Sequence, residues 1–162
     1  YYRFEPYLLA EGIEGFKGIL RRFERLGKWS GSEFIADYAH HPREISAVLA
    51  SAKEVCRGRL FVVFQPHTYS RTKLLFNEFI SALKGIENLV IYKTYAAREY
   101  FDSAGSAYTL AENLPNALYA ESIKELKFYL KPVLAQGDMV LFLGAGDIYC
   151  VAKLLLKQLS EI

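Results

Sequence analysis

The feature that most constrains the fold is a run of five apolar residues at positions 60–64, followed by Gln65 and Pro66. An unbroken run of β-favouring apolar residues is typical of a strand that is covered on both of its faces. Pro66 has no backbone N–H to donate to a neighbouring strand, so we expect the strand to end there. The sheet that contains this strand therefore needs other elements packed on each side of it.

The rest of the chain repeats this pattern, because short apolar runs alternate with stretches of helical periodicity. We expect strands at residues 33–38, 60–64, 89–92, 118–120 and 139–143. We expect helices within residues 8–26 and at residues 42–57, 68–84, 107–113, 123–134 and 148–159. Strands that alternate with helices predict an α/β fold with a doubly wound, mainly parallel sheet, helices on both faces and a Rossmann-like arrangement.

Composition narrows the class of protein and of partner. The chain has 162 residues, which suits one domain with a core of its own. Its 20 basic and 18 acidic residues give a net charge of +2, which indicates no nucleic-acid or membrane partner, and no apolar run reaches membrane-spanning length. Cys56 and Cys150 fall in apolar helical patterns, so we predict two buried free thiols and a reducing, cytoplasmic location.

Polar side chains gather directly after four of the expected strands, at residues 37–41, 65–71, 94–99 and 144–147. The carboxyl ends of parallel strands share one edge of a sheet, and the ligands of open α/β sheets bind in the crevice outside that edge. The convergence of these four segments predicts a ligand site along this edge.

The segment after the strand at 60–64 favours an anion. We expect Thr68 or Ser70 to cap the helix that begins there. Arg71 then lies in the first turn, where a cation opposes the helix dipole. A bound anion, held by the fork of the guanidinium, would remove that conflict.

The three histidines all lie in the polar segments. His40 and His41 are adjacent, so their side chains point in different directions and would rarely hold the same metal ion, and only His67 could supply a third imidazole. We therefore predict no metal site, and we expect these side chains to form hydrogen bonds with a substrate or a nucleotide.

Two further motifs have modest interpretations. Gly144 and Gly146 match half of a dinucleotide-binding fingerprint, but the rest of it is missing, so we expect a tight strand-to-helix turn that a ligand can approach closely. The charged run at residues 21–25 is interpreted as a solvated face. The sequence contains no Walker-type phosphate loop and no Ser-His-Asp order, so a self-contained hydrolase is disfavoured.

Four segments, in order and at matching spacing, resemble the Mur ligases: DYAHHP at 37–42, FQPHTYSRT at 64–72, YAARE at 95–99 and GAGDI at 144–148. The second and fourth resemble the branch that joins L-alanine to UDP-N-acetylmuramate. Residues 16–24 resemble the end of the central ATPase domain of that family. The resemblance is specific because four motifs match together.

The resemblance divides the chain into a linker with the end of a central ATPase domain, residues 1–26, and a carboxyl-terminal domain, residues 27–162. It implies a fragment of a three-domain enzyme, an expectation that the abrupt aromatic start favours. It also implies ATP-dependent amide ligation in peptidoglycan precursor synthesis, in which ATP and Mg²⁺ activate the muramoyl carboxylate and the amine of L-alanine attacks the acyl phosphate. Both ATP and Mg²⁺ need the missing central domain, so we expect no activity from this chain alone.

The binding residues that the resemblance implies can be placed in this sequence. Arg22 would approach the phosphates of ATP, and Asp37 would approach its ribose, with Tyr38 nearby. His67 and Arg71 would hold the carboxylate of L-alanine. These assignments come from the matching motifs and not from spacing alone.

His40, His41 and Gly144 complete the predicted substrate-binding set. Thr68 stands where some members carry a second arginine, and Ala36 where many carry a second acid, so the number of anchoring side chains is left open. Two alternatives also remain: a sibling ligase that adds another amino acid or a peptide, and a nonenzymatic α/β domain that binds a small molecule or a protein.

Overall fold

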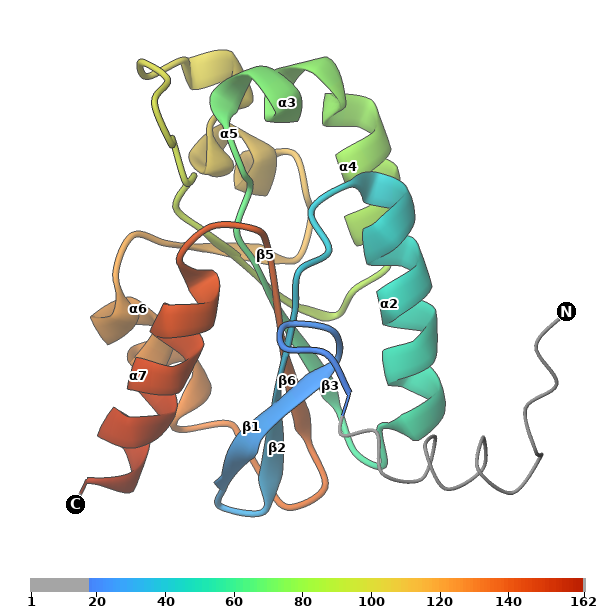
Figure 1. Ribbon diagram of the computed structural model, residues 1–162, viewed down its shortest axis with the longest axis vertical. Helices are drawn as coiled ribbons and strands as arrows, with labels where there is room; N and C mark the ends of the chain where they lie inside the picture. The colour runs from blue at the N-terminus through green and yellow to red at the C-terminus, as the bar shows by residue number, and fades with distance from the viewer. Residues whose placement is uncertain (1–17, 162) are drawn as a thin grey trace, which may run out of the picture.

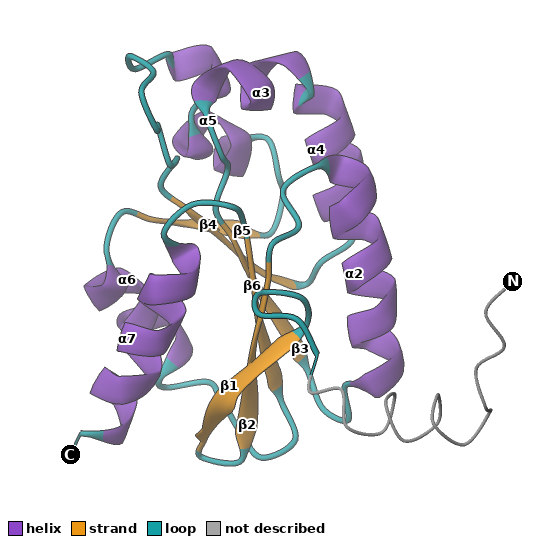
Figure 2. Ribbon diagram, in the orientation of Figure 1, coloured by secondary structure: helices purple, strands orange, loops and turns teal. Residues whose placement is uncertain are grey.

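The protein folds into one six-stranded sheet with helices packed against both faces (Figures 1 and 2). The computed structural model describes residues 18–161. The strands lie in the order β1-β2-β6-β3-β4-β5 and are β1 (Glu24–Trp29), β2 (Ser32–Asp37), β3 (Leu60–Phe64), β4 (Asn88–Tyr92), β5 (Ala117–Ala120) and β6 (Met139–Leu143). The helices are α2 (Pro42–Val55), α3 (Tyr69–Leu74), α4 (Phe76–Leu83), the 3₁₀ helix η1 (Ser103–Gly105), α5 (Ala107–Glu112), α6 (Ile123–Leu130) and α7 (Ile148–Ser160).

Strands β2 to β6 are parallel, which confirms the predicted mainly parallel, doubly wound sheet. Asp37 of β2 and Phe64 of β3 both pair with Leu143 of β6, so these strands end at the same level. This register brings the loops that follow the strands together at one edge of the sheet.

The sheet has an apolar core on each face, as the unbroken apolar run of β3 predicts. Val62 and Phe64 are fully buried on the face covered by α2 and α4, with α5 packed beside them (Figure 2). Phe61 and Val63 are buried on the opposite face, which α6 and α7 cover. Alternate residues of one strand therefore serve two separate cores.

The sixth strand was not predicted. β1 pairs antiparallel with β2 at the edge of the sheet, where only one of its faces meets the core. Its apolar residues Leu26 and Trp29 pack on the face covered by α7. The interpretation of residues 21–25 as a solvated face is correct for Arg22 and Arg25, which are exposed, but not for Arg21 and Glu24, which are partly buried. Of the helix expected within residues 8–26, residues 8–17 lie outside the described residues, and the remainder forms turns and β1.

Three other details differ from expectation. The helix expected at 68–84 is divided at Leu75 into α3 and α4, because Leu75 leaves the helical region with φ −108° and ψ 25°. Helix α6 ends at Leu130, before the predicted end at residue 134. The predicted burial of both cysteines is wrong, since Cys150 lies on the exposed side of α7 and Cys56, the cap residue of α2, is partly exposed. Among residues 18–161, no helix combines the length and the apolar character needed to cross a membrane.

Candidate functional site

The predicted convergence of the strand ends is confirmed by backbone hydrogen bonds at the carboxyl edge of the sheet. The amide of Gly144 donates to the carbonyl oxygen of Asp37 at 3.2 Å, and the amide of Gln65 donates to that of Leu143 at 2.9 Å. The loop after β4 joins them, because the amide of Thr68 donates to the carbonyl oxygen of Tyr95 at 2.9 Å. Four segments far apart in the sequence thus form one continuous rim along this edge of the sheet, made of residues 37–41, 65–71, 94–99 and 144–147.

Asp37 fixes the start of this rim. Its side chain is buried, and its two carboxylate oxygens accept hydrogen bonds from the amides of Ala39 at 2.7 Å and Phe23 at 2.8 Å. The carboxylate therefore ties the loop after β2 to the segment that precedes β1. The role of Asp37 toward a ribose stays a prediction, and each oxygen retains a lone pair that could accept a further hydrogen bond.

The centre of the rim is formed by two imidazoles and a phenol. The Nδ1 atom of His40 lies 2.9 Å from the carbonyl oxygen of Tyr38, which holds the ring in place. The ring centroid of His40 is 6.0 Å from that of His67, and His67 in turn stacks on Tyr95 with a centroid separation of 5.3 Å. The predicted residues His40 and His67 are therefore neighbours in space.

His67 and Arg71 both carry a polar atom that is buried and unsatisfied. Within the described residues, neither Nδ1 of His67 nor Nη1 of Arg71 has a hydrogen-bond partner. Burial lowers the pKa of His67, and the nearby positive charge of Arg71 lowers it further. Buried polar groups without a partner are uncommon in folded proteins and point to a missing ligand or water. The pair therefore fits an anion that would neutralise Arg71 and accept a hydrogen bond from each side chain.

Thr68 holds Arg71 in position at a conformational cost. As predicted, Thr68 caps the following helix: its hydroxyl accepts a hydrogen bond from the amide of Arg71 at 3.4 Å. Its φ is +70°, which a β-branched residue rarely adopts. The neighbouring Ser70 is held from the loop after β4, because its amide donates to the carboxylate of Glu99 at 2.9 Å. The hydroxyl of Ser70 also donates to Glu99, and this hydrogen bond and that of the amide lower the pKa of Glu99.

The turn at residues 144–146 is tight, as the glycines predict. Gly144 has a φ of +148°, and a methyl group at Gly146 would lie 2.5 Å from the Cγ atom of Tyr95. Gln65 supports the turn from below: its Oε1 accepts from the amide of Ile148 at 3.0 Å and its Nε2 donates to Asp147 Oδ1 at 2.7 Å. Gln65 is thus a structural residue of the rim whose role was not predicted, although it stands inside the motif that marks the site.

Arg21 is the other residue that the sequence did not reveal. It was assigned to a solvated face, yet its guanidinium reaches across the rim to the turn after β6, where it donates to the carbonyl oxygens of Gly144 and Gly146. Its neighbour Arg22 is exposed, with its guanidinium 5.5 Å from the ring centroid of Tyr38. Arg22 makes no hydrogen bond through its side chain within residues 18–161, so it is free to meet an anion.

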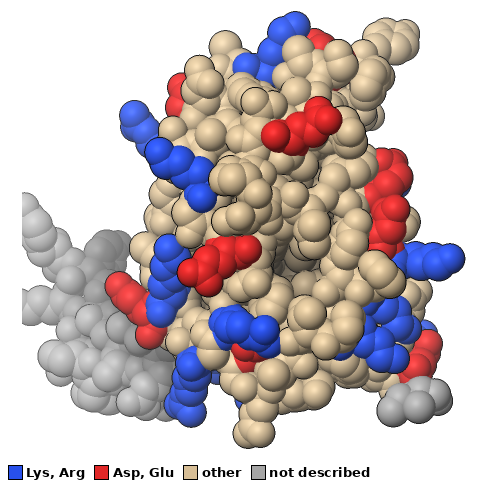
Figure 3. Space-filling model, turned by 180° about the vertical axis from the view of Figure 1, so that it is seen from behind, with Lys and Arg blue, Asp and Glu red and all other residues tan. Residues whose placement is uncertain are grey.

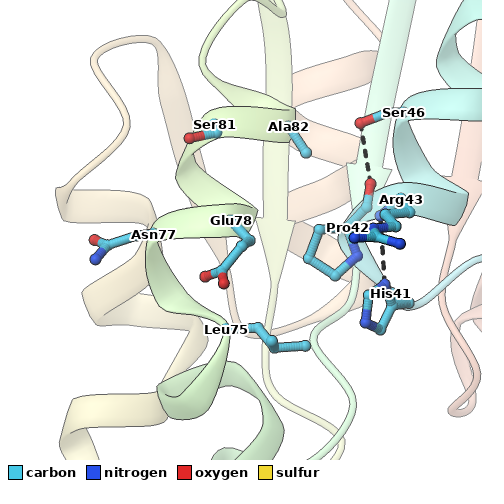
Figure 4. Close-up of a pocket in the computed structure, with 9 residues that line it drawn as sticks. All are labelled: His41, Pro42, Arg43, Ser46, Leu75, Asn77, Glu78, Ser81 and Ala82. Carbon is cyan, nitrogen blue, oxygen red and sulfur yellow. Dashed lines mark hydrogen bonds between the residues drawn. The ribbon is translucent and has the colours of Figure 1, made fainter.

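His41 caps helix α2 and lines a groove beside it. Its Nδ1 accepts a hydrogen bond from the amide of Arg43, and it forms the amino-terminal cap of α2 with Pro42 as the first helical residue, as predicted for Pro42. Its ring lies at one end of a separate groove of about 650 Å³ between α2 and α4 (Figure 4), lined by His41, Pro42, Arg43, Ser46, Leu75, Asn77, Glu78, Ser81 and Ala82. A substrate role for His41 stays a prediction that the geometry does not favour.

Charge on the surface is mixed. On the face seen in Figure 3, lysine and arginine side chains are interspersed with acidic ones, as the near-neutral composition predicts. In the part of the chain that the structure describes, no three His, Cys, Asp or Glu side chains come together in a way that could hold a metal ion. The rim therefore offers donors to an anion and does not by itself form a magnesium site.

The sequence and the structure were then compared with known proteins. Residues 21–146 match the family model described as "Mur ligase, glutamate ligase domain". The UDP-N-acetylmuramate–L-alanine ligase of Lachnospira eligens is 46% identical over 153 residues, which cover 92% of this chain and 33% of the relative. The chain thus spans about a third of the length of the curated relatives that it matches.

Solved structures agree with this result. The UDP-N-acetylmuramate–alanine ligase of Thermotoga maritima is similar with a TM-score of 0.68 and 29% identity, covering 91% of this chain and 32% of that one. A bifunctional folylpolyglutamate synthase/dihydrofolate synthase of Yersinia pestis, solved with AMPPNP and a manganese ion, gives a TM-score of 0.70 at 15% identity, over 97% of this chain and 35% of that one. The second likeness concerns the fold alone.

Proposed function

This chain belongs to the Mur ligase family, and from that membership we propose that it is the amino-acid-binding, carboxyl-terminal domain of an ATP-dependent UDP-N-acetylmuramate–L-alanine ligase. Its relative from Lachnospira eligens bears that name, and this chain matches about a third of it. The activity of the whole enzyme, its role in cytoplasmic peptidoglycan precursor synthesis and its substrates are all parts of the proposal.

One observation carries the proposal: the buried, unsatisfied Nδ1 of His67 and Nη1 of Arg71. A buried polar group without a partner costs about 1–3 kcal/mol, and more when it is charged. The carboxylate of an amino acid would offer two oxygens to these two nitrogens and a negative charge to the guanidinium. The rim around them is held by backbone hydrogen bonds before any ligand arrives, so little further ordering is needed.

The residues of this chain would bind and orient the amino acid. Arg71 would hold the carboxylate, and His67 would fix its direction, so that the amine of the amino acid points away from the rim. Neutral His67 is favoured at neutral pH because its pKa is lowered by burial and by Arg71. The positive charge of Arg71 then faces the carboxylate of the amino acid.

The nucleotide would lie near the start of the rim. Arg22 is exposed, and its guanidinium makes no hydrogen bond to the described residues, which fits a role toward the phosphates of ATP; the ring of Tyr38 lies beside it. When bound, ATP supplies the phosphoryl group that activates a carboxylate for amide formation. The resemblance to the Mur ligases implies that the Mg²⁺ that accompanies ATP would be held by the central domain of the enzyme.

A chimaeric enzyme tests the proposal. Residues 18–162 of this chain would replace the matching third of the Lachnospira eligens ligase, and phosphate release would be measured with UDP-N-acetylmuramate and a panel of L-alanine, glycine, L-serine and D-glutamate. We expect L-alanine to give the highest kcat/KM. The unmodified 162-residue chain is the control, and we expect it to release no phosphate because it contains no phosphate loop.

Two results would contradict the proposal. Preference for another amino acid would make the protein a sibling ligase. A chimaera that folds and binds ATP but shows no dependence on any amino acid would favour a nonenzymatic binding domain.

A further inference from the structure

Arg21 connects the segment before β1 to the turn after β6. Its Nη2 donates to the carbonyl oxygen of Gly146 at 3.0 Å and to that of Gly144 at 3.3 Å. These contacts join residues more than 120 positions apart in the sequence. A single nitrogen of the guanidinium thus holds two carbonyls of the same tight turn.

Aromatic rings and a carboxylate fix Arg21 in this position. The guanidinium carbon lies 4.6 Å from the ring centroid of Tyr38 and 5.5 Å from that of Tyr149 on α7. Glu24 accepts from the amide of Arg21 at 2.6 Å and from the hydroxyl of Tyr149 at 3.0 Å. Arg21 has a φ of +60°, a strained backbone that persists only where the surroundings demand it.

The turn that Arg21 holds packs against Tyr95, which stacks on His67. Gly146 lies so close to Tyr95 that even a methyl group would collide with the ring. Tyr95 stacks on His67, and its amide and carbonyl are both bonded to the backbone that flanks His67, at Pro66 and Thr68. A displacement of the turn would therefore move Tyr95, and Tyr95 would move the imidazole.

We propose that Arg21 is a positioning residue that couples the segment preceding β1 to the carboxylate pocket of His67 and Arg71, through the turn at 144–146 and Tyr95. A shift of this segment would reach the pocket because Arg21 contacts the turn, the turn contacts Tyr95, and Tyr95 contacts His67. When Arg21 releases the turn, the imidazole loses its fixed direction and the affinity for a carboxylate falls. This inference deepens the proposed function and rests on it for the identity of the ligand.

Nuclear magnetic resonance of the 162-residue chain tests the coupling. The ring resonances of His67 would be followed during titration with L-alanine, in the wild type and in Arg21→Gln, Arg21→Lys and Arg25→Gln. Arg25 is exposed on β1 and is the matched control, because its substitution removes the same charge without touching the turn. We expect Arg21→Gln to weaken binding roughly two- to thirtyfold, a range typical of residues that modulate coupling without touching the ligand. Arg21→Lys should give a smaller loss, and Arg25→Gln should bind like the wild type.

The outcomes separate the inference from the proposed function. If the wild type shows no response to L-alanine, the proposed function fails, and the coupling is then judged by the ring shifts and pKa of His67 without ligand, which Arg21→Gln should alter and Arg25→Gln should not. If Arg21→Gln melts at a lower temperature but binds L-alanine with unchanged affinity, Arg21 is only a structural residue and the inference is overturned. If Arg21→Gln does not fold, Arg21→Lys decides, and wild-type affinity in that variant overturns the coupling.

Discussion

Two arginines at opposite ends of strand β3 have opposite surroundings. Arg59, just before the strand, donates to both carboxylate oxygens of Asp138, at 2.7 Å and 3.3 Å, and to the carbonyl oxygen of Val133. Arg71, after the strand, has a buried Nη1 with no partner in the described part of the chain. The same side chain is therefore satisfied by the protein at one end of the sheet and left unsatisfied at the other.

The contrast extends to the backbone. Five non-glycine residues of the described chain have positive φ, and four of them, Arg21, Phe23, Thr68 and Ala97, belong to the segments around the rim. Strain of this kind costs about 1–3 kcal/mol per residue and is typical of functional sites. The hydrogen bonds at the end of the sheet near Arg59 stabilise the fold, whereas the end near Arg71 holds polar atoms that could form hydrogen bonds with a ligand.

The largest effect on stability is expected at the satisfied end, from Asp138→Ala. Asp138 is 3% exposed and accepts hydrogen bonds from the amides of Arg59 and Ala135 in addition to the Arg59 side chain. Its removal would leave these two amides without partners, so the free energy of unfolding should fall by about 2–4 kcal/mol. Urea denaturation of the 162-residue chain measures this change.

The matched control is Asp102→Ala, which removes an exposed carboxylate that pairs with Lys73 at 3.0 Å and accepts a hydrogen bond from the amide of Ala104 at 2.9 Å. Exposed ion pairs contribute little to stability, and an exposed amide can bond to water instead, so the midpoint should fall much less than in Asp138→Ala. Equal losses from the two variants would mean that the two ends of the sheet contribute equally to stability.

The second prediction concerns Arg71→Ala in the chimaeric ligase. Loss of a charge-assisted hydrogen bond to the amino-acid carboxylate costs roughly 1.5–3 kcal/mol, so the KM for L-alanine should rise about ten- to a hundredfold. The KM for ATP should stay nearly constant. The unfolding midpoint should not fall, because the Arg71 side chain makes no hydrogen bond or ion pair to another residue of the described range 18–161. Steady-state kinetics with each substrate varied in turn measures the effect.

Two variants sharpen this test. Arg71→Lys should recover only part of the loss, since an ammonium keeps the charge without the fork. Lys73→Ala, on the exposed side of the same helix, should leave the KM for L-alanine unchanged. A variant Arg71→Ala that binds alanine normally but loses ATP would show that Arg71 serves the nucleotide.

The sequence predicted the parallel part of the sheet well because those strands are buried on both faces and appear as apolar runs. β1 escaped prediction for the opposite reason. It is an edge strand in which exposed Arg25 and Lys28 alternate with partly buried Leu26, and a bulge between Arg25 and Gly27 interrupts its register. A short charged segment of this kind carries little strand signal.

The convergence of the strand ends that forms the candidate site was also predictable, but the side-chain contacts that support it were not. Segments that follow parallel strands must meet at one edge, so the meeting of His40, His67 and Gly144 follows from topology. The contacts of Arg21 and Gln65 depend on side-chain directions across more than 80 residues of sequence, for which no local pattern exists. The positive φ of Thr68 could not be predicted either, because the sequence shows a threonine and not the backbone conformation that it adopts.

A smaller effect is expected from the strain itself, by comparison of Thr68→Gly with Thr68→Ala. Alanine removes the helix cap and keeps a side chain at φ +70°, whereas glycine tolerates this conformation and is itself an acceptable cap residue. The free energy of unfolding of Thr68→Gly should therefore be about 1 kcal/mol higher than that of Thr68→Ala. Equal stability of the two variants in urea denaturation would mean that the backbone at Thr68 is not strained.

The smallest effect is a pH dependence at His67. Its pKa is lowered by burial and by Arg71, so between the folded pKa and the ordinary value of about 6.5 the unfolded chain binds more protons than the folded one. The contribution of neutral His67 to the free energy of unfolding is thus fully present at pH values above the ordinary histidine pKa, and it is lost as the pH falls toward the lower pKa of the folded protein. His67→Gln should remove this part of the decline, as measured by denaturation at a series of pH values.

A bound carboxylate should reverse the direction of the pKa shift, because a negative charge beside His67 favours the imidazolium and screens Arg71. In a proton titration followed by nuclear magnetic resonance, saturating L-alanine should therefore raise the pKa of His67. By linkage, L-alanine should then bind more tightly as the pH falls through this range. The ring resonances of His41, which lines the separate groove, should not move when L-alanine is added. If L-alanine moved the resonances of His41 and left His67 unchanged, the amino-acid site would lie in the groove between α2 and α4, and the contrast between Arg71 and Arg59 would lose its functional meaning.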